Sequence, residues 1–87
     1  MMKKIKILIP VYNDWQSLSE LLINIDNKIE NINSEISIII ADDASTFDRQ
    51  LDLENLININ SIKVLVMKEN RGHARCIATG MRYILKK

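Results

Sequence analysis

Glycine, proline and cysteine are scarce in this chain of 87 residues, which contains two, one and one of them. With glycine only at Gly72 and Gly80, neither a G-x-G-x-x-G dinucleotide motif nor a P-loop is present. Cys76 has no partner for an internal disulfide, and one cysteine with one histidine rules out a Cys/His zinc site. We expect Cys76 to be a small buried apolar residue of a helix.

Neither sign of charge dominates the composition. Twelve Lys and Arg residues against eleven Asp and Glu leave a net charge of +1, which predicts neither nucleic acid nor an anionic membrane as a partner. No apolar run approaches the length of a membrane span. The N-terminal run is broken at Pro10 and Asn13 and lacks the features of a signal peptide. We therefore expect a single cytoplasmic domain.

Three apolar runs, residues 5–11, 36–41 and 62–67, are typical of strands that are covered on both faces of a sheet. Helical patterns lie after each run, although the one in residues 46–60 is weak and predicts only a short helix. Strands that alternate with helices at this spacing predict an α/β fold with a parallel sheet. We therefore predict three βα units and the strand order 3-2-1.

Two of the helices are predicted from clear apolar stripes. The first begins after a cap at Asn13 or Asp14, or uses a capping box of Ser17 and Glu20. The last begins near Gly72. The stripe of the first helix is Leu18, Leu21, Leu22, Ile25 and Ile29, and that of the last is Ala74, Ile77, Ala78, Met81 and Leu85.

Polar side chains follow all three predicted strands, at the edge where parallel α/β sheets bind ligands. Tyr12 offers an aromatic surface, and the pair Asp42 and Asp43 offers hydrogen-bond acceptors. Arg71 and Arg75 offer planar guanidinium groups, each of which can bind two phosphate oxygens. Together they are typical of a nucleotide site. Each also has a simpler interpretation, because the ring can pack over a strand end, the acidic pair can cap a turn and the arginines can form a solvated helix face.

Three segments together resemble a known family. Residues 7–13, 38–45 and 70–75, with 79–81, resemble the N-terminal portion of a family 2 glycosyltransferase with the GT-A fold. The third segment is similar to polyprenyl-phosphate sugar transferases of the dolichol-phosphate mannose synthase type. The resemblance covers residues 5–85, nearly the whole chain.

The resemblance implies roles for residues at the ends of the first two strands. Pro10 and Tyr12 would flank the base of a UDP- or GDP-sugar. Asp43 would accept a hydrogen bond from the base, while Asp42 would help to hold the loop. Ala44 departs from the family, which usually has glycine at this position, so the turn is expected to differ there.

The resemblance also shows what the chain lacks. Arg71 or Arg75 would approach the diphosphate, but no Asp-x-Asp metal motif follows Glu69, and the acceptor base of the family is missing too. We therefore expect the nucleotide-sugar-binding portion of a glycosyltransferase that is incomplete and inactive alone, with polyprenyl phosphate as a candidate acceptor. No catalytic or metal-binding residue is assigned, and Mg²⁺ or Mn²⁺ is expected only with the missing C-terminal portion.

The strand at residues 5–11 would be an exposed edge, since the family covers it with a further strand. We expect a homo-oligomer or a partner chain along that edge, and membrane association only through a partner. Two other classes remain open. One is a non-catalytic nucleotide-binding or protein-interaction module. The other is a receiver-like signalling domain, in which the acidic pair would follow the first strand rather than the second.

Overall fold

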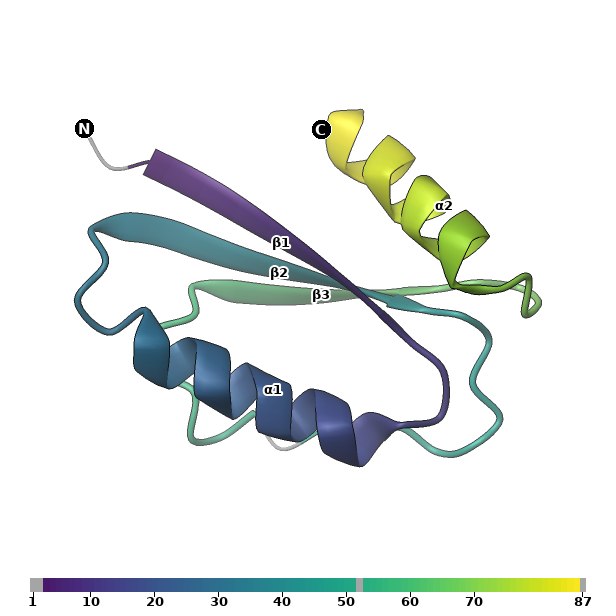
Figure 1. The fold of residues 1–87 in the computed structure, drawn as a ribbon, viewed down its shortest axis with the longest axis horizontal. Helices are drawn as coiled ribbons and strands as arrows, with labels where there is room; N and C mark the ends of the chain where they lie inside the picture. The colour runs from purple at the N-terminus through teal and green to yellow at the C-terminus, as the bar shows by residue number, and fades with distance from the viewer. Residues whose placement is uncertain (1–2, 52, 87) are drawn as a thin grey trace.

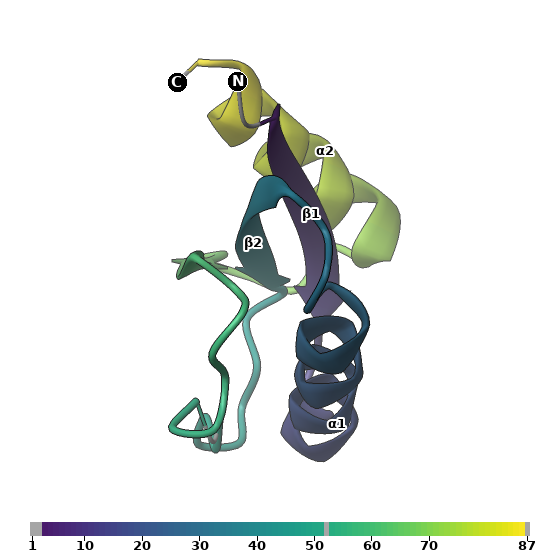
Figure 2. The same ribbon diagram turned by 90° about the vertical axis from the view of Figure 1, so that its left-hand side faces the viewer.

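A parallel three-stranded sheet lies between two helices in the computed structural model, which describes residues 3–51 and 53–86 (Figures 1 and 2). The strand order is β1-β2-β3, so the predicted α/β fold and strand order are confirmed. None of the described helices is long and apolar enough to cross a membrane. The elements in chain order are β1 (Lys3–Val11), α1 (Trp15–Lys28), β2 (Ser34–Asp42), β3 (Ser61–Val66) and α2 (His73–Leu85).

The central strand β2 forms the core. Ile38 and Ile40 are completely buried on the face that packs against α1, and Ala41 is completely buried on the face beneath α2. Val11 of β1 and the α1 side chains Trp15, Leu18 and Leu22 complete the cluster around the two isoleucines. Burial on both faces explains why β2 is the most continuously apolar run of the sequence.

Helix α1 begins at Trp15 because Asp14 caps it, accepting the backbone N–H of Ser17 at 3.2 Å. Of the predicted caps, this one is observed, whereas Ser17 already lies inside the helix. Leu18 and Leu22 are buried as the stripe predicted, but Leu21 remains 42% exposed.

The predicted short helix in residues 46–60 is wrong, because the described part of this segment forms bends and turns. Its backbone N–H groups find acceptors on distant side chains instead. Asn13 Oδ1 accepts from Thr46 and Phe47 at 2.8 and 2.9 Å. Asp26 accepts from the three residues Ile57, Asn58 and Ile59 at 2.7–3.1 Å. Such side-chain acceptors compete with helix formation.

Helix α2 begins after Gly72 as predicted, but it buries a different face from the predicted one. Its buried residues are Cys76 and Gly80, whereas Ile77, Met81 and Leu85 are 39%, 45% and 77% exposed. The cause is close packing on β1, since a Cβ at Gly80 would lie 2.7 Å from Cδ1 of Leu8. The small residues allow the helix to approach the sheet and turn the apolar stripe outward.

Candidate functional site

The strand ends and the start of α2 meet at the carboxyl edge of the sheet (Figure 1). β1 and β2 end side by side, with Val11 opposite Asp42 and the N–H of Asp43 donating to the carbonyl of Val11 at 2.9 Å. The chain then continues from β3 through Met67, whose N–H donates to the carbonyl of Asp42 at 2.8 Å. All three strand ends are thus tied together at the predicted edge.

Asp42 holds the loop that follows β2. Its carboxylate is buried, and Oδ1 accepts the N–H of Ser45 at 2.9 Å. The hydroxyl of Ser45 in turn accepts the N–H of Asn13 at 2.8 Å, which links this loop to the one after β1. Asp42 lines neither of the two hollows that contain the other predicted site residues.

Ala44 adopts a left-handed backbone conformation, with φ of 59°. An L side chain is strained in this region, and only glycine enters it freely. This geometry explains why a glycine would suit the position at which the sequence departs from the family it resembles. Asn13 has a similar φ of 62°, which asparagine tolerates better, and its side chain is fixed by Thr46 and Phe47.

Replacing Ala44 by glycine should stabilise the protein by about 1 kcal/mol, because the strain at positive φ outweighs the extra freedom of glycine in the unfolded chain. Urea denaturation followed by circular dichroism measures the change. Ala41→Gly in β2 is the matched control and should destabilise, since that residue is buried in a strand. Equal or lower stability of Ala44→Gly would contradict the strain.

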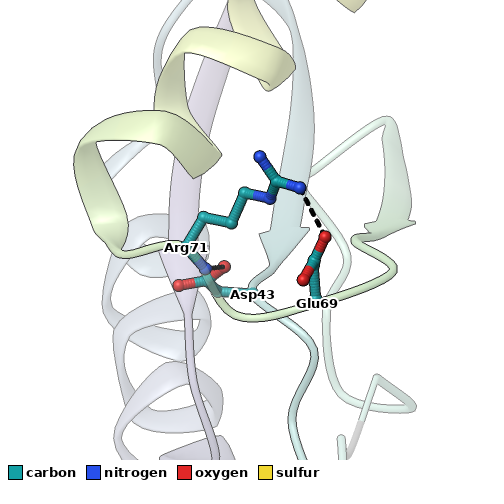
Figure 3. A network of polar contacts seen from close by, with 3 residues as sticks. All are labelled: Asp43, Glu69 and Arg71. Atoms are coloured by element: carbon teal, nitrogen blue, oxygen red, sulfur yellow. Dashed lines mark hydrogen bonds and ion pairs between the residues drawn. The ribbon is translucent and has the colours of Figure 1, made fainter.

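The carboxylate of Asp43 braces the start of α2 (Figure 3). The residue is 1% exposed, and its two oxygens accept the N–H groups of Arg71 and Gly72, each at 3.1 Å. Asn70 Oδ1 also accepts the N–H of Gly72, at 3.0 Å. The sequence left open that the acidic pair caps a turn, but it did not predict that Asp43 holds the start of the distant helix α2.

The two predicted arginines differ in their surroundings. The guanidinium of Arg71 points away from Asp43 and pairs with Glu69 (Figure 3). The hydrogen bond and the charge of Glu69 raise the pKa of Arg71. Arg75 makes no ion pair with any described residue. Of the two arginines, Arg75 is therefore the one that is free to meet an anion without exchanging a partner.

The predicted site residues divide between two hollows, one on each side of the start of α2. Pro10 and Tyr12 line a mainly apolar hollow of about 360 Å³ together with His73. Asp43, Arg71 and Arg75 line a second hollow of about 180 Å³. The structure thus places an aromatic wall and a cationic wall at one edge, but not in one common cavity.

Leu18 and Leu21 of α1 line the apolar hollow as well, a role that was missed in the sequence because both were assigned to the core stripe. The partial exposure of Leu21 is the feature that distinguishes it from a core residue.

A larger hollow of about 620 Å³ lies between the first turn of α1 and the loop at Thr46 and Phe47, and it contains none of the predicted site residues.

Cys76 is buried as predicted, and it donates a hydrogen bond from Sγ to the carbonyl of Ala41 at 3.2 Å. Burial raises the pKa of the thiol, and the negative charges of Asp43 and Asp42 raise it further. A thiolate nucleophile is therefore not available at this edge.

Comparison with known proteins agrees with the motifs. Residues 6–86 match Glycosyl transferase family 2. The undecaprenyl-phosphate 4-deoxy-4-formamido-L-arabinose transferase of Proteus mirabilis (strain HI4320) is 30% identical over an alignment of 79 residues, and the match covers 88% of this chain. The matched part is 24% of that transferase, so the chain spans about a quarter of its length. No solved structure matches the chain.

Proposed function

The chain belongs to glycosyl transferase family 2, and from this premise we propose that it binds the nucleotide part of a UDP- or GDP-sugar donor. The observation that supports the proposal is the pair of hollows on either side of the start of α2, one walled by Pro10 and Tyr12 and the other by Arg75. A base needs a flat apolar surface and a diphosphate needs cations, and both lie at the edge where open α/β sheets bind ligands.

In this proposal Pro10 and Tyr12 flank the base, and the guanidinium of Arg75 meets the diphosphate. The backbone N–H groups of Arg71 and Gly72 already donate to the carboxylate of Asp43. These hydrogen bonds fix the position of the segment that carries Arg71 and Arg75. Arg71 contributes to phosphate binding only after it exchanges Glu69 for the ligand. Asp43 then acts mainly by holding the loop, with a base contact as its secondary role.

Members of the family typically use a divalent metal, and the described residues do not fit one. Within residues 3–51 and 53–86, no three His, Cys, Asp or Glu side chains gather closely enough to hold a metal ion. Asp42 and Asp43 are both engaged by backbone N–H groups. We therefore assign no step to a metal in this chain, and donor binding here is expected to be independent of Mn²⁺.

Transfer of the sugar is proposed to require further polypeptide, with polyprenyl phosphate as the acceptor because the Proteus relative is named for undecaprenyl phosphate. The free edge of β1 suits a second copy or a partner chain. Because Val11 directs its carbonyl toward β2, alternation along the strand directs the N–H groups of Lys4, Lys6 and Leu8 outward. Pro10 has no N–H to offer at the same edge.

Calorimetric titration with UDP and GDP, with and without Mn²⁺, tests the proposal. We expect binding of at least one nucleotide, and Arg75→Ala should weaken it about tenfold or more, the size of a lost charge-assisted hydrogen bond. Arg49→Ala removes the same charge from an exposed residue that lines neither hollow and should leave the affinity unchanged. Absence of binding to any nucleotide would refute the donor site and favour a protein-interaction module.

A further inference from the structure

Charge is segregated along the chain, although the net charge is only +1. Residues 12–60 contain ten acidic and two basic residues. Residues 61–87 contain seven basic and one acidic residue, and residues 1–11 contain three lysines and no acidic residue. A composition that looks balanced therefore hides an acidic middle and two basic ends.

The fold brings the two basic ends together on the α2 face of the sheet. Leu8 points toward α2, because its side chain lies under Gly80, and side chains alternate along a strand, so Lys4 and Lys6 share that face. Leu8 of β1 pairs with Ile39 of β2, and Ile39 pairs with Lys63 of β3. Lys63 is therefore on the same face of the sheet as Leu8. Of these lysines, Lys4 is partly neutralised by Glu35 at 3.9 Å.

The outer surface of α2 adds both apolar and basic side chains to this face. The helix contains no acidic residue from His73 to Leu85. Ile77, Met81 and Leu85 are exposed, and Arg82 and Lys86 lie beside them, also exposed. α2 runs antiparallel to β1, so this half of the helix lies toward the amino ends of the strands, away from the proposed nucleotide site (Figures 1 and 2).

We propose that this face of α2, defined by Ile77, Met81, Arg82, Leu85 and Lys86, binds the surface of an anionic lipid bilayer. Exposed apolar side chains beside arginine and lysine are the pattern of helices that lie in the membrane interface. The apolar residues enter the boundary of the acyl chains, while the cations remain at the lipid phosphates.

A second copy of the chain fits this face less well. Two copies that met through α2 would bring together two surfaces rich in Lys and Arg, with Glu35 as the acidic partner of Lys4 only. Like charges across an interface oppose association. An anionic bilayer instead complements every cation on the face, and it requires no matching shape.

Co-sedimentation with phosphatidylcholine vesicles that contain about 30% phosphatidylglycerol tests the proposal. We expect binding that weakens as salt rises, because the attraction is electrostatic in part. The double reversal Arg82→Glu/Lys86→Glu should reduce binding about tenfold or more. Leu85→Ser should also reduce binding, and because this side chain is 77% exposed, the substitution leaves the fold intact.

The matched control is Lys28→Glu/Arg49→Glu, which changes the net charge equally in the acidic segment and should bind as the unchanged protein does. Equal loss in both double variants would show a response to net charge alone and would refute a specific face. Binding to pure phosphatidylcholine at the same strength, or to neither vesicle, would also refute it. Self-association in light scattering that Leu85→Ser abolishes, without vesicle binding, would assign the face to a second copy.

Discussion

Replacing Asp26 by alanine is expected to remove a large part of the free energy of unfolding of the protein. The carboxylate is 3% exposed and accepts three backbone N–H groups, those of Ile57, Asn58 and Ile59. Each buried donor left without an acceptor costs about 1–3 kcal/mol. The total of about 3 kcal/mol or more is a large part of the stability of about 5–10 kcal/mol expected for a domain of this length.

Urea denaturation of Asp26→Ala measures the loss, and Glu20→Ala provides the control on the exposed face of the same helix. We expect a change of no more than about 0.5 kcal/mol for Glu20→Ala, as for most surface substitutions. If Asp26→Ala had the same free energy of unfolding as the unchanged protein, the segment between β2 and β3 would not depend on this carboxylate for its structure.

The same residue makes the stability depend on acid. Burial alone would raise the pKa of Asp26, but the hydrogen bonds from Ile57, Asn58 and Ile59 outweigh it, and the pKa is lowered. The carboxylate of Asp26 therefore binds a proton less readily in the folded state than in the unfolded state, where an aspartate side chain has a pKa of about 3.9. The stabilisation is complete above about pH 5 and is lost as the pH falls toward the lowered pKa. Asp26→Asn should flatten this part of the stability profile.

Replacing Asp43 by alanine is expected to detach the start of α2 and to abolish the proposed nucleotide site. The N–H of Arg71 loses its acceptor, whereas that of Gly72 keeps Asn70 Oδ1. One orphaned donor and the loss of a negative charge near the helix N-terminus together cost about 2–3 kcal/mol. The cationic hollow should widen, because Arg71 and Arg75 are no longer held beside β2.

Hydrogen exchange at the first turn of α2 measures this detachment directly, and calorimetry with UDP and GDP measures the effect on binding. Asp43→Asn is the informative partner variant, because its amide oxygen retains one of the two hydrogen bonds, so the loss should be smaller. Asp48→Ala removes an exposed carboxylate and should change neither readout. Unchanged exchange in Asp43→Ala would contradict the bracing role.

The three strands and the positions of α1 and α2 could be predicted because their patterns are local. β2 is buried on both faces, and its sequence contains a continuous apolar run. α1 has a clear apolar stripe, and Leu18 and Leu22 of that stripe are buried in the core. The crossing between β2 and β3 could not be predicted, since its N–H groups are satisfied by Asn13 and Asp26, more than 30 residues earlier in the chain. No local pattern contains that information.

The candidate site was predicted at the level of its edge but not of its contacts. Topology alone places Tyr12, Asp43 and Arg75 at the carboxyl edge. The use of Asp43 by backbone donors depends on how α2 sits on the sheet, and that packing was misjudged because it uses Cys76 and Gly80 rather than the apolar stripe. Small residues carry little hydrophobic signal, so a close helix contact built from them is easily overlooked.

Because Cys76 is buried, the rate at which its thiol reacts with a reagent reports how often α2 opens. The sulfur lies between the helix and Ala41, so a disulfide reagent reaches it only when the helix lifts from the sheet. The rate of labelling under native conditions therefore reports the free energy of that partial opening, separately from global unfolding. A bound nucleotide that bridges both sides of the helix start would slow the labelling, even though it never touches the sulfur.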